Sequence, residues 1–183
     1  RLLSPASTIW RRRAAARIAK TTPVKVAAPV ICIGNAVAGG AGKTPVAIAV
    51  CESLIRQGGA PHFLSRGYGG SLSGPVRVDP AQHDARDVGD EPLLLARHAP
   101  TWVAHDRVAG AKAAFAAGAG TIVMDDGFQN PSLFKDISIL VVDGGYGFGN
   151  GRVMPSGPLR EALDDAVDRA NAIAIVGADI CGI

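Results

Sequence analysis

A glycine-rich stretch at residues 34–45 constrains the fold of this chain more than any other feature of its sequence. It follows an apolar run at residues 30–33 and precedes a helix-like pattern at residues 46–56. The stretch contains Gly-Gly-Ala-Gly-Lys-Thr, and a strand, such a loop and a helix together make the layout of a phosphate-binding P-loop. Glycines let backbone N–H groups turn inward around anionic oxygens, and the helix start adds partial positive charge. The stretch therefore predicts a nucleotide site. The alternative is a glycine-rich turn with a chance Gly-Lys-Thr, which the flanking patterns disfavour.

Lys43 and Thr44 carry the chemistry of such a loop. A P-loop lysine reaches the terminal phosphates of ATP, and the hydroxyl beside it holds a magnesium ion. The usual motif has Gly five residues before the Gly of Gly-Lys-Thr, and this chain has Val37 there. The loop is therefore a variant P-loop, for which we expect ATP and Mg²⁺ as ligands.

A second apolar run, at residues 121–124, ends in Asp125 and Asp126. A carboxylate at the end of a strand beside a P-loop can hold magnesium directly or through water. Either aspartate fits this Walker B-like position, and both are candidate metal ligands. The alternative is a plain turn.

Asp90 and Glu91 are adjacent carboxylates just before Pro92, and a helical pattern follows at residues 93–98. Such a pair beside a phosphate site suits metal binding and proton abstraction. The structural alternative is that Asp90 or Glu91 caps the helix, with Pro92 in its first turn.

The short strand expected at residues 62–65 runs into Arg66 and a glycine-rich segment at residues 67–70. Flexible backbone and a cation at the end of a strand match the place where ligands bind in α/β folds. The alternative is a glycine turn with a surface arginine.

Strand patterns alternate with helical ones along most of the chain. This alternation predicts an α/β fold of the P-loop NTPase type, a mainly parallel sheet between two layers of helices. The loops richest in Gly, Asp and Arg follow strands, so we expect them at one edge of the sheet. Besides the segments above, we expect strands at residues 75–78, 101–105, 136–143 and 172–176, helices at residues 107–117 and 163–170, and a charged connection at residues 84–87.

The composition is that of a globular protein rather than a disordered one, with 48% hydrophobic and 19% charged residues among 183. Its cysteines, Cys32, Cys51 and Cys181, have no metal-binding spacing, and two fall in patterns expected to be buried. This predicts a reducing compartment without disulfides. No uncharged apolar run reaches the length of a transmembrane helix, and no signal-peptide layout is present.

The positive charge is concentrated at the N-terminus. Residues 1–51 hold eight basic residues and no acidic one, whereas the remainder has 11 basic and 16 acidic residues. Residues 1–21 predict a basic helix that contains Ile9 and the interfacial residue Trp10, with Ser7 or Thr8 as its cap. We expect this helix to bind an anionic membrane surface. The alternative is a solvated basic helix that packs on the domain of residues 22–183. No aromatic-interleaved binding face is present, so nucleic acid is not expected.

Several segments together resemble one family, the tetraacyldisaccharide 4'-kinase or lipid A 4'-kinase of Gram-negative bacteria. The resemblance spans most of residues 30–161, and members of this family tolerate a non-glycine residue at the position of Val37. The motifs that carry it are Gly34-Asn35 through the P-loop to Pro45, Ser65-Arg66-Gly67-Tyr68-Gly69, Val88-Gly89-Asp90-Glu91-Pro92, Asp125-Asp126-Gly127-Phe128-Gln129, Gly149-Asn150-Gly151 and Pro155 through Glu161.

The resemblance implies transfer of the ATP γ-phosphate to the 4'-hydroxyl of a tetraacylated glucosamine disaccharide, at the cytoplasmic face of the inner membrane. It implies a metal site formed by Thr44, Glu91, Asp125 and Asp126. The implied nucleotide contacts are Gly39, Gly40, Ala41, Gly42, Lys43, Thr44 and Gln129.

The resemblance also implies the remaining catalytic roles. Asp90 would be the base for the sugar hydroxyl, and Lys43 would contact the phosphates. Arg107, Arg160 and Glu161 would arrange the phosphates and the substrate. These residue types suit phosphoryl transfer, which depends mainly on positioning and charge neutralisation.

Family members are longer than this chain and carry a second α/β portion, from which a histidine supports the catalytic aspartate. No residue of this chain matches that histidine, and the chain starts at Arg1 without Met. We therefore expect a piece of a longer protein, able to bind nucleotide but with reduced or absent kinase activity. The alternatives are a switch or partitioning ATPase and a nucleotide-binding module without lipid kinase activity.

Overall fold

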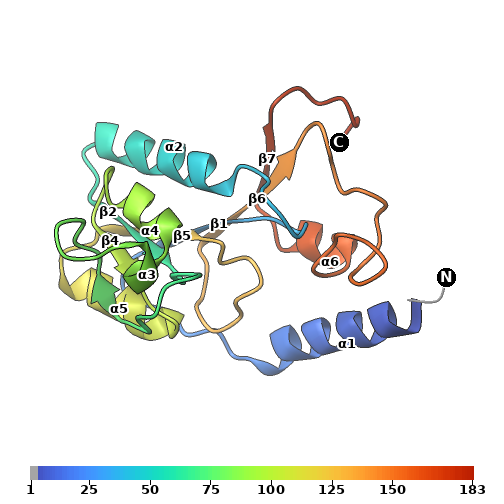
Figure 1. The fold of residues 1–183 in the computed structure, drawn as a ribbon, viewed down its shortest axis with the longest axis horizontal. Coiled ribbons are helices and arrows are strands. Elements are labelled where there is room, and N and C mark those ends of the chain that lie inside the picture. The colour runs from blue at the N-terminus through green and yellow to red at the C-terminus, as the bar shows by residue number, and fades with distance from the viewer. Residues whose placement is uncertain (1–3) are drawn as a thin grey trace.

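Seven strands form one sheet in the order β3-β4-β2-β5-β1-β6-β7, within residues 4–183, which the computed structural model describes (Figure 1). The strands are β1 Val30–Gly34, β2 Pro61–Ser65, β3 Val76–Arg77, β4 Thr101–Val103, β5 Thr121–Asp125, β6 Ile137–Asp143 and β7 Ala172–Val176. The helices are α1 Ser4–Lys20, α2 Lys43–Arg56, α3 Ala85–Val88, α4 Asp90–Leu95, α5 Arg107–Ala116 and α6 Leu163–Asp168.

Every neighbouring pair of strands is parallel except β3 and β4. Strand β1 lies between β5 and β6, with Cys32 opposite Met124 on one side and Ser138 on the other. Parallel strands end at the same edge of a sheet, so the segments after β1, β2, β5 and β6 gather at one edge. The predicted mainly parallel α/β sheet is confirmed.

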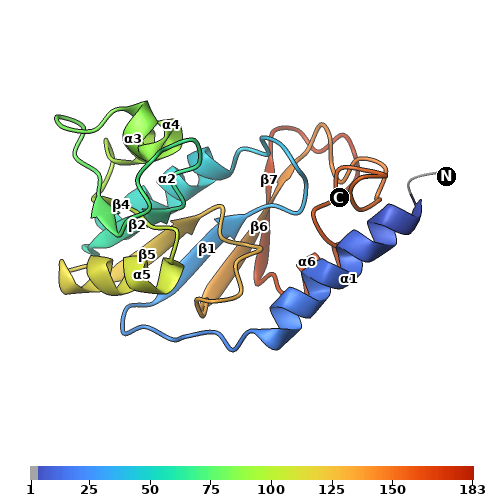
Figure 2. The same ribbon diagram turned by 60° about the horizontal axis from the view of Figure 1, so that its bottom comes forward.

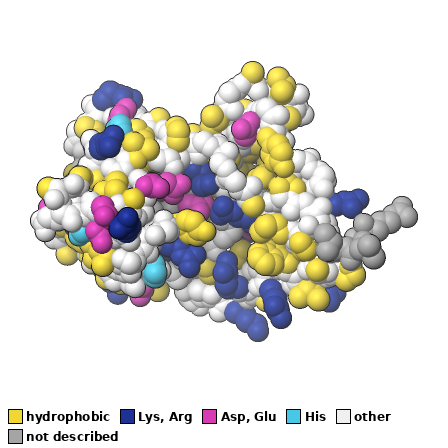
Figure 3. Space-filling view, viewed as in Figure 1, with side chains coloured by type: hydrophobic (Ala, Val, Ile, Leu, Met, Phe, Trp, Pro, Cys, Tyr) yellow, Lys and Arg dark blue, Asp and Glu magenta, His cyan; other side chains and the backbone are white. Residues whose placement is uncertain are grey.

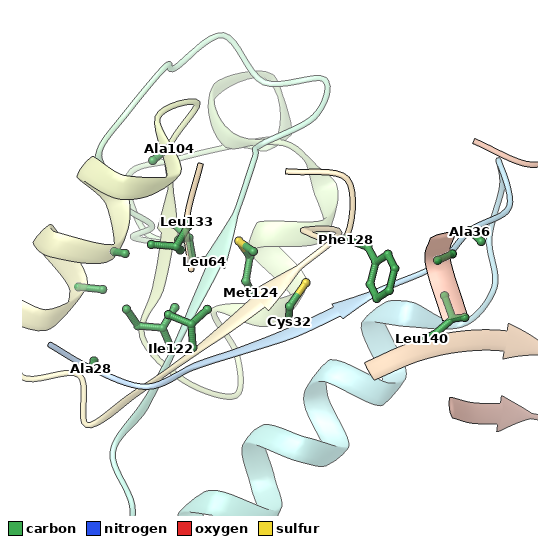
Figure 4. Close-up of a cluster of buried hydrophobic side chains, with 14 of the residues drawn as sticks. Ala28, Cys32, Ala36, Leu64, Ala104, Ile122, Met124, Phe128, Leu133 and Leu140 are labelled. Carbon is green, nitrogen blue, oxygen red and sulfur yellow. The ribbon is translucent and has the colours of Figure 1, made fainter. Parts of the chain in front are cut away.

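Alternate side chains of β1 point to opposite faces of the sheet, as the strand repeat requires. Cys32 lies in one buried cluster with residues of α5 and α6, and Figure 4 shows it beside Met124 of β5. Ile33 lies in a second cluster with Ala47 and Cys51 of α2 and Leu95 of α4. Helices therefore cover both faces, which confirms the expected three layers.

All three cysteines are free thiols, and Cys32 and Cys51 are buried as expected, whereas Cys181 is exposed. Burial raises the pKa of the Cys32 and Cys51 thiols to about 11. Both side chains therefore act as small apolar core residues.

The segment at residues 84–87, expected to be a charged connection, contains most of the short helix α3. Asp84 accepts hydrogen bonds from the backbone N–H groups of Arg86 and Asp87, and the Asp87 carboxylate accepts one from the N–H of Asp84. This reciprocal capping box stabilises the single turn of α3. The segment is therefore mostly helical, because its two aspartates cap the turn as well as carry charge.

Several element boundaries also differ from the predictions; α2, for example, begins at Lys43 rather than at residue 46, and α6 ends at Asp168 rather than at residue 170. Helix α4 begins at Asp90 after Gly89, which supplies no side-chain cap, so Asp90 and Glu91 lie in the first turn and the capping interpretation was wrong. Strand β4 ends at Val103, because the Asp106 carboxylate already caps α5. Helix α1 begins at Ser4, before the expected caps at Ser7 and Thr8, since Pro5 suits a first helical turn.

Helix α1 lies outside the sheet layers and runs beside α6 and the loop after β6 (Figure 2). Ser7 is hydrogen bonded to Ser156 at 2.7 Å, and the Trp10 indole donates to the carbonyl of Arg160 at 3.0 Å. Arg17 donates to the carbonyl of Gln129 at 3.1 Å. The helix is therefore attached to the segments that follow β5 and β6. No helix within residues 4–183 is long and apolar enough to cross a membrane.

The close approach of β1 to the loop after β5 generates the first prediction. A Cβ at Gly34 would lie 2.4 Å from Cβ of Phe128, which is buried. Replacing Gly34 by Ala should lower the free energy of unfolding by about 2 kcal/mol, because backbone must move to accept the methyl group. Urea unfolding followed by circular dichroism measures this.

Gly120→Ala is the matched control, because its Cβ would meet its nearest neighbour at an ordinary 3.6 Å. Equal unfolding midpoints for the two variants would contradict the close packing at Gly34.

Candidate active site

The P-loop backbone is held by a buried side chain that its sequence pattern did not single out. Asn35 is fully buried and donates from Nδ2 to the carbonyls of Val37, at 2.7 Å, and Gly39, at 3.3 Å. Gly42 ends the loop with φ 78°, a conformation that favours glycine, and α2 begins at the next residue. The N–H groups of the first turn of α2 therefore open onto the loop, which suits an anion.

Val37 fits because its position needs no glycine. It forms an antiparallel bridge with Leu159, and the flanking N–H groups of Ala38 and Arg160 donate to the carbonyls of Pro158 and Ala36. The start of the P-loop is therefore a short strand pairing with the segment that carries Arg160. This pairing brings Arg160 to the nucleotide loop.

Lys43 and Thr44 start α2 and face the end of β5. Lys43 is 9% exposed, and its Nζ lies 3.8 Å from Oδ1 of Asp126 and 3.5 Å from the carbonyl of Gly39. The Thr44 hydroxyl donates to Oδ2 of Asp125 at 3.2 Å. The P-loop and the Walker B-like aspartates are therefore in direct contact.

Asp125 is the most deeply buried carboxylate of the site, with 1% of its surface exposed. Its pKa is raised to about 6, mainly by burial and then by the negative charges of Glu91 and Asp126, while Lys43 and Thr44 oppose this rise. Its Oδ1 has no hydrogen-bond partner among the described residues. An orphaned, buried carboxylate oxygen is a poor structural group and a suitable ligand for a cation.

Asp126 has φ 50°, and no other non-glycine residue in the described chain has positive φ. Its carboxylate accepts from Nη1 of Arg160 at 3.1 Å and lies 3.8 Å from Nζ of Lys43. Two cations from distant segments therefore meet at one carboxylate.

Gln129 binds Arg160, and Glu161 in turn binds Gln129. Gln129 accepts from Arg160 at 3.3 Å and donates from Nε2 to Glu161 at 3.1 Å and to the carbonyl of Asn35 at 2.8 Å. Glu161 is 3% exposed and forms an ion pair with Arg169. Sequence patterns gave no sign of Arg169, because its partner is identified only by the fold.

Arg107 is 3% exposed at the start of α5 and donates to the carbonyl of Ala104. Its pKa is lowered to about 10, mainly by burial and then by the charge of Arg66, while the charges of Asp126 and Asp125 oppose this. Its Nε has no partner within residues 4–183. Arg107 therefore lies within electrostatic range of the aspartates but makes no ion pair with them.

The first turn of α4 brings one of its two carboxylates into the electrostatic field of the site. Glu91 is exposed, and its charge contributes to the raised pKa of Asp125. Asp90 is also exposed, and its carboxylate makes no hydrogen bond or ion pair with the described residues. Glu91 thus acts on the site through its charge, whereas Asp90 makes no contact with it.

The residues fit a magnesium ion only with help from a phosphate ligand. No group of three or more His, Cys, Asp or Glu side chains in the described chain is placed to hold a metal. Mg²⁺ characteristically binds one or two carboxylates, substrate phosphates and waters. The orphaned oxygen of Asp125 and the adjacent Thr44 hydroxyl match that donor set.

A cavity of about 400 Å³ separates α1 from the Gln129–Arg160 side of the site. Trp10, Ala14 and Met154 line it together with the arginine side chains Arg13 and Arg17. It is therefore apolar with a cationic rim. The sequence indicated a basic helix with an interfacial tryptophan, but not that this helix borders the phosphate site.

Comparison with known proteins places the chain within one group. The family model for tetraacyldisaccharide-1-P 4'-kinase matches residues 1–181. A tetraacyldisaccharide 4'-kinase of Parvibaculum lavamentivorans is 59% identical, covering 97% of this chain and 52% of the relative. A tetraacyldisaccharide 4'-kinase of Rhodospirillum rubrum is 55% identical, and the match covers 98% of this chain and 54% of that relative. This chain thus spans about half the length of these relatives.

A solved structure agrees with these relatives. The "apo" form of LpxK from Aquifex aeolicus, in complex with ATP, matches with a TM-score of 0.84 and 27% identity. The match covers 99% of this chain and 60% of that one.

The raised pKa of Asp125 generates the second prediction. In EDTA, the native protein holds this proton up to about pH 6, whereas an unfolded aspartate releases it near 3.8. The native state therefore binds more protons between these values, so the free energy of unfolding falls as pH rises through them. In Asp125→Asn, the free energy of unfolding should fall by up to about 3 kcal/mol less over this pH range than it does in the wild type.

Urea unfolding of both proteins between pH 4 and 7 measures the difference. Added Mg²⁺ should stabilise the wild type more than Asp125→Asn, because it compensates the buried charge. Identical pH profiles for the two proteins would contradict the assignment.

Proposed function

The chain belongs to the tetraacyldisaccharide-1-P 4'-kinase family, and we propose on that premise that it transfers the γ-phosphate of ATP to the 4'-hydroxyl of a tetraacylated glucosamine disaccharide. The observation that carries this proposal is the convergence of Lys43 and Arg160 on Asp126 at the P-loop. Two cations beside a helix N-terminus suit the terminal phosphates of ATP better than a lone P-loop lysine does.

The roles on the nucleotide side follow from these positions. Backbone N–H groups of residues 39–44 and the ammonium of Lys43 would hold the phosphates, while Arg160, supported by Gln129, would neutralise charge on the transferred group. Buried Arg107 adds positive potential without an ion pair of its own. Phosphoryl transfer requires this kind of positioning and charge neutralisation.

Asp125 and Thr44 would hold magnesium, with Asp126 and Glu91 adding negative potential around it. When bound, Mg²⁺ neutralises phosphate charge and orients the transferred group. Thr44 already donates its hydroxyl to Asp125, so the pair is pre-oriented for a shared cation.

Asp90 is the group we assign to the sugar hydroxyl. The 4'-oxygen would attack the γ-phosphorus, the bond to the bridging β–γ oxygen would break, and the hydroxyl proton would pass to Asp90. A base needs free carboxylate oxygens, and Asp90 is exposed with both of its oxygens unengaged within the described chain. Glu161, by contrast, is buried and paired, which suits it to orient Gln129.

The cavity beneath α1 is where we place the acylated acceptor. Its apolar lining from Trp10, Ala14, Ile18 and Met154 suits hydrocarbon, and its arginines suit the phosphate that the family name specifies. Arg160 borders both this cavity and the nucleotide site. The acceptor would therefore approach the phosphates from the α1 side.

The same helix would rest on the cytoplasmic face of the inner membrane as a peripheral element. Ile9 and Trp10 are 55% and 48% exposed, and the adjacent arginines Arg11, Arg12 and Arg13 are exposed as well. Apolar and basic side chains appear together on this part of the surface in Figure 3. Such a surface suits anionic headgroups. The chain should therefore bind vesicles of anionic lipid in a sedimentation assay and should not bind neutral vesicles.

An assay of label transfer tests the proposed function. The 183-residue chain is incubated with γ-labelled ATP, Mg²⁺ and the disaccharide lipid, beside a full-length relative as reference. Asp90→Ala should lower transfer by at least about 100-fold and leave ATP binding unchanged. Lys43→Ala should instead weaken ATP binding, because it removes a phosphate contact. Asp164→Ala, an exposed acid of α6, is the control for Asp90.

Label on water alone would favour a switch ATPase. Binding without turnover, beside transfer by the full-length relative, would mean that this piece acts alone only as a nucleotide-binding module, as expected for a piece with reduced or absent kinase activity. Undiminished transfer by Asp90→Ala would remove Asp90 from the role of base.

A further inference from the structure

We propose that Arg169 is a positioning residue that keeps Arg160 on the phosphate site by acting through Glu161 and Gln129. This inference rests on the proposed function, because it concerns how the cation for the terminal phosphate is held. Arg169 follows α6 and touches none of Lys43, Asp125 or Asp126, so its role has to be indirect.

Arg169 is fixed at three points. Its Nη1 donates to the carbonyl of Asp165 at 2.8 Å, and its Nη2 pairs with Oε2 of Glu161. Its guanidinium carbon lies 5.3 Å from the ring centre of Phe128, within the range of a cation–π contact. Phe128 is buried and follows the two site aspartates by two residues. Arg169 therefore supports both sides of the junction between the β5 loop and the Arg160 segment.

Glu161 needs this partner because its carboxylate is only 3% exposed. A buried carboxylate without a paired cation is costly, and the nearby cations then compete for it. Lys135 also lies in this region, but its ammonium is bound to the carbonyl of Phe128 at 3.0 Å and makes no ion pair with Glu161 within the described residues. Arg169 is thus the cation that pairs directly with Glu161, and Lys135 adds only an attraction at longer range.

Gln129 transmits this arrangement to Arg160. Its Nε2 donates to Glu161 at 3.1 Å, which leaves Oε1 directed to Nη1 of Arg160 at 3.3 Å. The same Nη1 lies 3.1 Å from Asp126. The side-chain amide of Gln129 therefore bridges Arg160 and the carboxylate of Glu161. Without Arg169, the uncompensated charge of Glu161 would draw Arg160 away from Asp126.

Titration calorimetry of the 183-residue chain with Mg-ATP and with Mg-ADP tests this relay. Arg169→Ala should weaken Mg-ATP binding about tenfold, as expected for loss of a hydrogen bond to a charged group, and change Mg-ADP binding less than about twofold. Arg169→Lys should restore part of the preference for ATP, because it returns the charge without the planar fork. Arg97→Ala, an exposed arginine after α4, is the matched control and should bind both nucleotides as the wild type does.

The decisive comparison is made in the Glu161→Gln background. There, Arg169→Ala should cost less than about threefold in Mg-ATP affinity, because no carboxylate remains to attract Arg160. An unchanged preference for ATP in Arg169→Ala, an equal loss for both nucleotides, or a full tenfold cost in the Glu161→Gln background would each overturn the inference. A wild-type chain that binds neither nucleotide would overturn the proposed function itself, and the inference with it.

Discussion

The meeting of Lys43 and Arg160 at the Asp126 carboxylate is the interaction on which the site depends. It joins the P-loop helix, the end of β5 and the segment after β6, which lie far apart in the sequence. Parallel strand order makes the meeting feasible, since β5 and β6 flank β1 and end at the same edge. Backbone pairing of Val37 with Leu159 then brings Arg160 within reach. The fold thus brings three segments that are distant in the sequence together in one charged site.

This arrangement favours ligand binding over stability. Asp125 is buried with an unpartnered oxygen and a raised pKa, Asp126 has a left-handed backbone, and Arg107 is buried with an unpartnered Nε. Each feature costs free energy in the folded protein, and such features concentrate at functional sites. The buried apolar clusters on both faces of the sheet offset that cost. We interpret the buried carboxylate of Asp125 and the left-handed backbone of Asp126 as features of a site prepared for a metal and phosphates.

Local patterns were enough to predict the layers, the P-loop and its contact with the aspartates at the end of β5. A strand followed by Gly-Gly-Ala-Gly-Lys-Thr and a helix has few structural solutions, and parallel strands fix the edge at which their loops meet. The capping box of α3 was also a local signal, but it was overlooked. The positions of Arg169 beside Glu161 and of Trp10 beside Arg160 could not be predicted in this way. These contacts depend on how α6 and α1 dock, and no short sequence pattern encodes that docking.

A crystal structure of this chain with Mg²⁺ and a non-hydrolysable ATP analogue tests the central claim most directly. Phosphate oxygens compete with Asp126 for the two cations, so we predict that Lys43 and Arg160 contact the β- and γ-phosphates while Asp125 and Thr44 share the metal. Phosphates bound elsewhere, or at the P-loop with Arg160 still paired to Asp126 and remote from the γ-phosphate, would contradict this account.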